Sequence, residues 1–148
     1  MHAEVVKPAL KFLADPDYSG PNAEFLTAHE HYRHGRYASC LVECNKAFES
    51  TMKVICEMQG WPFDNDRDGA RRLIIKCKDN GLFPPFQQAA LTHVVGVLET
   101  AVPTTRNRRA AHGGGAAPII VPASLAAYGL HMAAANILLL IEAEKALP

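Results

Sequence analysis

The stretch YASCLVECNKAFESTMKVICEMQ at residues 37–59 decides the fold class. Its apolar positions recur three and four residues apart, which is the spacing of one face of an α-helix. These positions are Leu41, Cys44, Phe48, Thr51, Ile55 and Met58. Charged and polar residues fill the opposite face, so the stretch predicts a long helix with one side in a hydrophobic core.

The same periodicity predicts helices on both sides of this stretch, and no alternation of apolar and polar residues predicts a β-strand. We expect these helices at residues 8–14, 23–34, 66–79, about 84–101 and 123–145. In the helix that opens at Pro84-Pro85 we expect buried side chains at Phe86, Ala90, Val94, Val97 or Leu98, and Ala101. The prediction is an all-α, antiparallel bundle of four to five main helices with short connections. We divide it into an N-terminal arm with a short helix, residues 1–22, and a bundle domain, residues 23–148.

The charge total argues against two classes of protein. The chain has 148 residues, with 15 Lys and Arg against 15 Asp and Glu. A net charge of zero argues against a protein that coats nucleic acid or membrane by bulk electrostatics. Contact with a polyanion therefore has to depend on a local group of cations.

Cysteine usage and the N-terminus favour a reducing cytoplasm. The first ten residues, MHAEVVKPAL, carry charges and a proline where a signal peptide has an apolar run. Cys40, Cys44 and Cys56 share one predicted helix and cannot pair with one another without breaking it. Residues 119–141 are apolar enough for a membrane span, but Pro122, His131 and Asn136 interrupt them, which favours a buried helix or subunit interface.

The segment VPTTRNRRAAHGGGAAPIIVP, residues 102–122, is the exception to the helical pattern. Connections of about 20 residues without secondary structure are usually functional or disordered. Between Glu99 and Glu142 the only formal charges are three arginines, Arg106, Arg108 and Arg109. Guanidinium groups match phosphate oxygens, and His112 adds a side chain that titrates near neutral pH. The segment can therefore act on a phosphodiester.

The heptapeptide from Arg106 to His112 has the form arginine, polar residue, four residues, histidine. At this place in a helical bundle it resembles the signature of HEPN-superfamily ribonucleases. The stretches AHEHYRHGRYASCLVECNKAFESTMKVICEMQGW and IIVPASLAAYGLHMAAANILLLIEAEK resemble the C-terminal domain of abortive-infection-like bacterial proteins, which belong to that superfamily. The resemblance extends over nearly the whole chain, from Glu4 to Lys145.

The resemblance implies a metal-independent, cofactor-independent endoribonuclease that works as a homodimer, with two motifs facing one cleft. Arg106 would bind and polarise the scissile phosphate, His112 would be the general acid or base, and Asn107 would orient one of them or the phosphate. The ribose 2′-hydroxyl would attack the adjacent phosphorus, giving a 2′,3′-cyclic phosphate, so the substrate is RNA. Such an enzyme would serve phage defence, and the resembled domain usually follows an upstream domain.

Several readings stay open at this stage. Arg108, Arg109 and Lys53 are candidates for contact with the RNA backbone, although Lys53 also has Glu49 four residues before it, as in an exposed ion pair. The alternatives to an enzyme are a non-catalytic HEPN module that binds RNA or a partner domain, and a helical protein-interaction domain. A zinc site would draw on His29, His31, His34, Cys40 and Cys44, whose spacing matches no familiar zinc motif.

Overall fold

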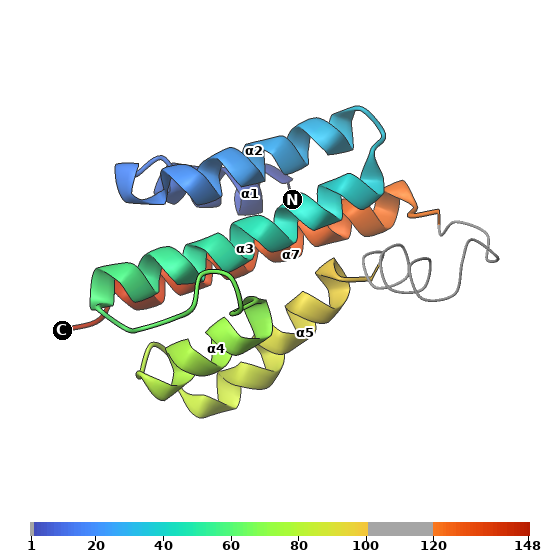
Figure 1. Ribbon diagram of the computed structural model, residues 1–148. Coiled ribbons are helices and arrows are strands. Elements are labelled where there is room, and N and C mark those ends of the chain that lie inside the picture. The colour runs from blue at the N-terminus through green and yellow to red at the C-terminus, as the bar shows by residue number, and fades with distance from the viewer. Residues whose placement is uncertain (1, 101–119) are drawn as a thin grey trace, which may run out of the picture.

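The computed structural model describes residues 2–100 and 120–148, and these residues form helices joined by turns (Figure 1). The helices are α1 (His2–Leu13), α2 (Ser19–Arg33), α3 (Tyr37–Gln59), α4 (Ala70–Asp79), α5 (Gln88–Leu98) and α7 (Ala123–Lys145). Single 3₁₀ turns, Pro16–Tyr18 and Pro85–Gln87, precede α2 and α5. The described residues contain no β-strand, so the all-α prediction is confirmed.

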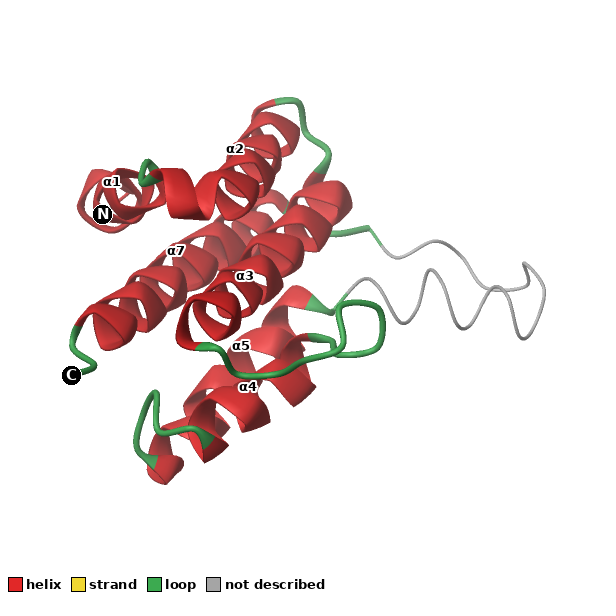
Figure 2. Cartoon of the chain, turned by 60° about the vertical axis from the view of Figure 1, so that its left-hand side comes forward, coloured by secondary structure: helices red, strands yellow, loops and turns green. Residues whose placement is uncertain are grey.

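The two long helices, α3 and α7, lie side by side in the centre, with α1 and α2 on one side and α4 and α5 on the other (Figures 1 and 2). At one end, residues 35–39 and 120–123 line one hollow. At the other end, Gln59 Nε2 donates a hydrogen bond of 3.2 Å to Glu144 Oε1. The two helices therefore run parallel, whereas α2 and α3 form an antiparallel hairpin. The antiparallel prediction is wrong for the central pair, because the α3–α4 connection and α5 carry the chain back towards the start of α3 before α7 begins (Figure 1).

Helix α3 buries the face that its sequence predicts. The fully buried positions include Leu41, Cys44, Phe48, Thr51 and Ile55. Met58 was expected on this face but is 40% exposed, because α3 leaves the core after Cys56. Gly60 ends the helix at φ 76°, a left-handed conformation that glycine adopts without a Cβ clash.

Helix α7 packs tightly against the Leu41 side chain of α3 at Gly129. A Cβ atom added to this glycine would lie 2.3 Å from Leu41 Cδ2. The surrounding positions on the same face are small or aliphatic and buried: Ala126, Leu130, Ala133, Ala134 and Ile137. The absence of a side chain at Gly129 is therefore what lets the two central helices pack at this distance.

Helix α7 is also long and apolar enough to cross a bilayer, and within the described residues it alone has this property. Central helices of globular proteins share that composition. In this structure α7 packs against α1, α3 and α5.

Helix α4 begins four residues later than the predicted start at residue 66. Asp64 Oδ1 accepts hydrogen bonds from the backbone N–H groups of Asp66, at 2.9 Å, and Arg67, at 3.0 Å. Asp68 Oδ2 accepts a third from the N–H of Asp64, at 2.7 Å. These carboxylates hold residues 64–68 in a turn, and the helix starts only at Ala70.

Helix α5 buries only part of the predicted face: Val94 and Leu98 are buried, as predicted. Phe86 is 80% exposed and Ala90 is also exposed, which contradicts the prediction. The buried face is Leu91, Val94, Val95 and Leu98. A 3₁₀ turn at Pro85–Gln87 has three residues per turn, so it shifts the register relative to an α-helix that starts at Pro85. Ala101 lies outside the described residues.

The N-terminal segment is more helical than predicted. Helix α1 starts at His2 and continues through Pro8, and α2 starts at Ser19 rather than at residue 23. Ala9 and Leu13 are buried, and α1 packs against α7. Residues 1–22 thus contribute side chains to the same core as the rest of the bundle.

Candidate functional site

The predicted catalytic residues Arg106, Asn107 and His112 lie outside the described residues, as do Arg108 and Arg109. The described chain stops at Thr100, just after α5, and resumes at Ile120, just before α7. The neighbourhood of these two ends is therefore the part of the candidate site that the structure defines. Each end lies beside a hollow in the surface.

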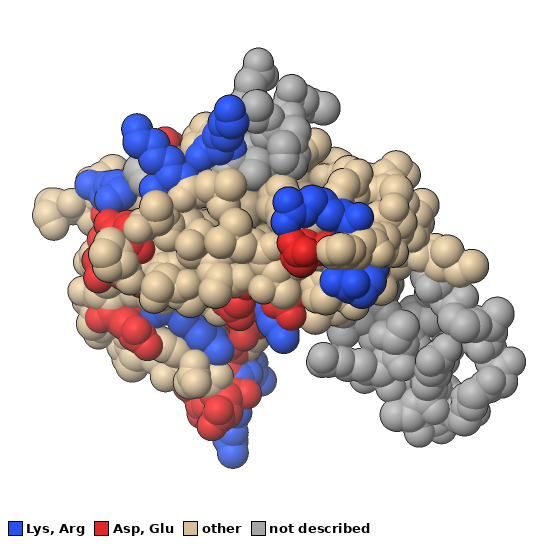
Figure 3. Space-filling view, turned by 90° about the horizontal axis from the view of Figure 1, so that it is seen from above, with Lys and Arg blue, Asp and Glu red and all other residues tan. Residues whose placement is uncertain are grey.

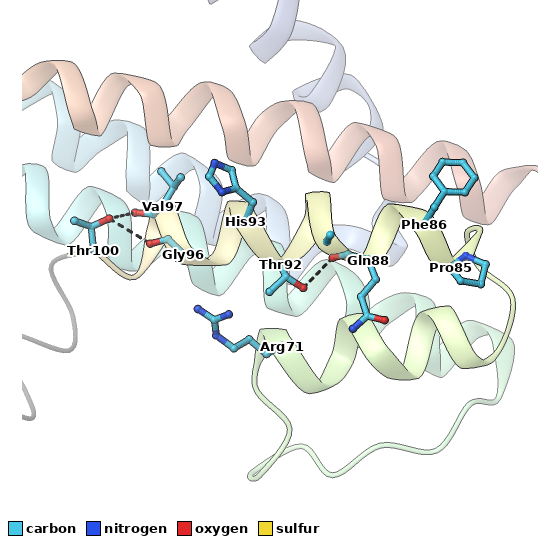
Figure 4. A pocket seen from close by; sticks show the side chains of 10 residues that line it. Arg71, Pro85, Phe86, Gln88, Thr92, His93, Gly96, Val97 and Thr100 are labelled. Carbon is cyan, nitrogen blue, oxygen red and sulfur yellow. Dashed lines mark hydrogen bonds between the residues drawn. The ribbon is translucent and has the colours of Figure 1, made fainter.

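The first hollow is an open groove of about 950 Å³ along α5 (Figure 4). Its lining comes from α5, from the preceding 3₁₀ turn and from Arg71 of α4, and it reaches Thr100 at one end and Phe86 at the other. Between them, the lining includes the exposed side chain of His93. The groove therefore runs along the outer face of α5 to the point where the described chain stops.

The side chains of this groove combine one aromatic ring with several polar groups. The hydroxyl of Thr92 donates to the Gln88 carbonyl at 2.8 Å, and that of Thr100 donates to the Val97 carbonyl at 2.6 Å. These hydroxyl protons are used within the helix, while each oxygen keeps the capacity to accept a hydrogen bond. The ring of Phe86, 80% exposed, is a flat apolar surface at the far end.

Arg71 supplies the positive charge of the groove. Its Nη2 donates a hydrogen bond of 3.2 Å to Glu99 Oε2, and its side chain is 52% exposed. An exposed ion pair of this kind contributes between about 0 and 1 kcal/mol. The guanidinium can therefore exchange Glu99 for another anion at little cost.

The second hollow, of about 580 Å³, lies where the α2–α3 turn meets the start of α7. Arg36 lines it, and its Nε donates a hydrogen bond of 2.8 Å to His31 Nδ1. His31 therefore accepts as a neutral imidazole while this bond exists. The bond leaves the terminal nitrogens of Arg36 to other acceptors.

The end of α2 adds further cations beside this hollow. Glu30 pairs with Arg33 and with His34, whose Nε2 lies 2.8 Å from Glu30 Oε1. The hydrogen bond from Arg33, followed by that from His34, lowers the pKa of the Glu30 carboxyl. The sequence stretch HEHYRHGR, residues 29–36, could have signalled this group, because it holds two arginines and three histidines against one acid. Figure 3 shows basic and acidic side chains interspersed on the face it presents, rather than one continuous basic surface.

Lys53, predicted as an RNA contact, lies in the C-terminal half of α3, whereas the second hollow lies at the start of this helix. Its Nζ is 3.2 Å from Glu49 Oε1 and donates a hydrogen bond of 2.9 Å to the Asn65 carbonyl. The predicted ion pair with Glu49 is confirmed, although the Lys53 side chain is only 18% exposed. Lys53 thus fastens the α3–α4 connection to α3, and its contact with RNA stays a prediction.

The residues of the alternative zinc site do not converge. Cys40 and Cys44 are fully buried in the core, whereas His31 and His34 are bonded to Arg36 and Glu30. Across residues 2–100 and 120–148, no three side chains of His, Cys, Asp or Glu form a group that could hold a metal ion.

Comparison with known proteins gives one match. Residues 19–144 of the 148 match the family Abi_C, described as a HEPN-like domain. The matched region begins with α2 and ends in the last turn of α7, and it includes the segment between α5 and α7. Neither the curated proteins nor the solved structures contain a match to this chain.

Proposed function

Because the chain belongs to the Abi_C family of HEPN-like domains, we propose that it is a metal-independent endoribonuclease. The observation that carries the proposal is the family match from residue 19 to 144, within which the sequence from Arg106 to His112 has the spacing of the HEPN motif. The substrate is RNA, because the reaction uses the ribose 2′-hydroxyl that DNA lacks.

In the proposed reaction the 2′-oxygen attacks the neighbouring phosphorus and the bond to the 5′-oxygen breaks. The products are a 2′,3′-cyclic phosphate and a 5′-hydroxyl. Arg106 stabilises the charge on the phosphoryl oxygens, and His112 moves the proton as general base or acid. Asn107 orients the phosphate or one of these two side chains. No cofactor takes part, since Arg106 supplies the positive charge.

The length of the chain limits how far the motif residues can lie from the two hollows. Arg106 follows Thr100 by six residues, so at most about 20 Å separates them, and His112 precedes Ile120 by eight, which allows at most about 28 Å. Thr100 and Ile120 mark the two hollows described above, with Arg71 beside one and Arg36 beside the other. Arg71 and Arg36 are thus candidates to hold the RNA backbone, together with Arg108 and Arg109.

We further propose that two copies of the chain pair, so that their motifs share one cleft, and that the enzyme acts in the cytoplasm during abortive infection by phage. The pairing is tested by mixing. A mixed dimer of the Arg106→Ala and His112→Ala proteins keeps one Arg106 and one His112. If the two copies share one cleft, the mixture should therefore regain part of the ribonuclease activity that neither variant has alone. A monomer mass for the wild type, measured by light scattering at the assay concentration, would contradict the shared cleft.

The activity itself is tested with end-labelled RNA in the presence of EDTA. We expect cleavage with 2′,3′-cyclic phosphate ends. The rate should fall at least about 100-fold for Arg106→Ala, through loss of charge stabilisation, and by a similar factor for His112→Ala, through loss of the general acid or base. Arg67→Ala is the matched control, because Arg67 is an exposed arginine in the α3–α4 connection. Circular dichroism verifies that each variant is folded.

The other outcomes separate the alternatives. RNA binding without cleavage by the wild type would favour the non-catalytic HEPN module. Absence of both binding and cleavage would contradict the proposal and favour a protein-interaction domain. Cleavage that EDTA abolishes would contradict the metal-independent mechanism.

A further inference from the structure

Two thiols from different helices meet in the core between α3 and α4. Cys56 lies in the last turn of α3 and Cys77 near the end of α4, and their Sγ atoms are 3.9 Å apart. Both side chains are fully buried, and 21 residues of chain separate them. Neighbouring buried residues on both helices, Ile55, Leu73 and Ile74, hold the two backbones in place.

We propose that Cys56 and Cys77 are an oxidation site, at which a hydroperoxide converts the pair into an intramolecular disulfide that ties α4 to α3. The two sulfurs are already in contact and come from separate elements. A disulfide bond of about 2.05 Å then requires the sulfurs to move together by about 2 Å, which rotation of the two short side chains and a small shift of α4 can supply.

The environment of the pair makes Cys56 the attacking group. The hydrogen bond with the Cys77 thiol lowers the pKa of Cys56, against the opposing effect of burial. The ammonium group of Lys76 also lowers this pKa, whereas the carboxylates of Asp68 and Glu57 oppose it. The pKa of Cys77 is raised by the same hydrogen bond and by burial. Since the thiolate is the nucleophile in this chemistry, Cys56 reacts first and Cys77 resolves the product.

The reaction balances with hydrogen peroxide as the oxidant. The Cys56 thiolate attacks one peroxide oxygen, an S–O bond forms, the O–O bond breaks, and the departing hydroxide takes up a proton to leave as water. The Cys77 sulfur then attacks Sγ of the Cys56 sulfenic acid, the S–O bond breaks, and the proton from Cys77 leaves with a second water. Two electrons pass from the two sulfurs to one peroxide.

The remaining two cysteines provide an internal control. Cys40 and Cys44 are also buried, but they lie one turn apart on α3. Side chains at this spacing have Cβ atoms about 5–6 Å apart, beyond the roughly 3.5–4.5 Å of a disulfide. Oxidation is therefore expected to join Cys56 to Cys77 and to leave Cys40 and Cys44 as thiols.

The disulfide would fix the position of α4, the helix whose Arg71 lines the α5 groove. Helix α4 carries Arg71, which bonds to Glu99 beside the end of α5. Because both thiols are buried, peroxide reaches them only when α4 opens locally from α3. The reaction then traps α4 in its docked position and prevents that opening. This inference is independent of the ribonuclease proposal, since its readouts are covalent mass and stability.

The test treats the folded full chain with hydrogen peroxide and analyses it by mass spectrometry without reduction. We expect a loss of 2 mass units, as two hydrogens leave, and a linked peptide that joins Cys56 to Cys77. The Cys40→Ser/Cys44→Ser double variant keeps this product, and the Cys77→Ser variant loses it. Thermal unfolding of the oxidised chain shifts upward by about 10 °C, and dithiothreitol reverses the shift.

Three results would overturn the proposal. These are four cysteines that stay reduced under peroxide that oxidises an unstructured thiol peptide, a linked peptide that contains Cys40 or Cys44, and oxidation only between different chains. Peptide mapping of the wild type gives this decision by itself, so the outcome does not depend on whether the serine variants fold.

Discussion

Replacing Gly129 with alanine tests the close packing of α7 against α3. The new Cβ would lie 2.3 Å from Leu41 Cδ2, whereas ordinary contact begins at 3.4 Å. The fully buried Leu41 side chain must therefore retreat by roughly 1 Å into a filled core. Overpacking of this kind costs about 1–3 kcal/mol, and alanine offsets about 1 kcal/mol of it through its higher helix propensity. We expect Gly129→Ala to lower the free energy of unfolding by about 1 kcal/mol.

The matched control is Gly96→Ala on α5. Gly96 is also inside a helix, but a Cβ added there has no heavy atom within 4 Å. Only the helix-propensity term remains, so this variant should be more stable than the wild type by about 0.5–1 kcal/mol. Urea denaturation followed by circular dichroism measures both variants. A Gly129→Ala protein as stable as Gly96→Ala would contradict the packing described here.

A double-mutant cycle assigns the cost to the contact itself. Leu41→Ala alone should cost about 2–5 kcal/mol, because it leaves a cavity in the core. In that background the methyl group added at position 129 enters the cavity, and its effect should become neutral or stabilising. The coupling energy between the two positions is expected to exceed about 1 kcal/mol. Equal effects of Gly129→Ala in both backgrounds would refute the reasoning.

Three further predictions concern the register of α5 and the α3–α4 connection. Phe86→Ala should change the unfolding free energy by less than about 0.5 kcal/mol, since the ring is 80% exposed. Leu91→Ala should cost about 2–5 kcal/mol, because Leu91 is buried. Similar losses of stability for both variants in urea denaturation would contradict the register of α5. The pKa of Asp68 is lowered by the hydrogen bond from the Asp64 backbone N–H and then by Lys76, so its stabilising effect is present above about pH 4 and is lost as the pH falls through its folded-state pKa. The urea concentration at the unfolding midpoint of the wild type should therefore fall as the pH is lowered from about 5 to about 2.5, and Asp68→Asn should make this fall smaller. The same fall in both proteins would exclude this role of Asp68. Lys53→Met should destabilise by about 1 kcal/mol through loss of its two polar partners. Fluorescence of Trp61, which lies in the same α3–α4 connection as Asn65, should report that loss as an earlier transition in urea.

The helices that could be predicted from sequence are those whose periodicity is long and uninterrupted. Residues 37–59 and 123–145 were predicted with the bounds that the structure shows, because each has six turns of consistent pattern. The start of α4 was not predicted, since an aspartate at 66 is as suitable for a helix cap as for the turn that Asp64 and Asp68 close. On α5, Val94 and Leu98 were predicted correctly, whereas Phe86 and Ala90 were not, because a 3₁₀ turn and an α-helix begin with the same Pro-Pro signal.

The candidate site, like the fold, could be predicted from the sequence only in part. The family and its HEPN-like nature could be identified from the motif together with its position and the flanking stretches, and they are confirmed by the match over residues 19–144. Its surroundings could be predicted only in part. The stretch HEHYRHGR could have signalled Arg36, whereas Arg71 and His93 line the α5 groove through helix packing, and their sequence neighbours give no signal of it. The thiol pair was equally hidden, since Cys56 and Cys77 meet only when α4 folds back on α3.

The separation of α3 and α7 along the chain sets the order of events during synthesis. Helix α3 ends at Gln59 and its central partner starts at Ala123, more than sixty residues later. At a translation rate of about 5–20 residues per second, the nascent α3 waits for several seconds with its apolar face covered only by α2 and the helices that follow. The arginine-rich segment leaves the ribosome before α7 does, so it is made while the bundle still lacks its centre. A HEPN-like domain built in this way would be translated in an unassembled state and completed only when its last long helix docks.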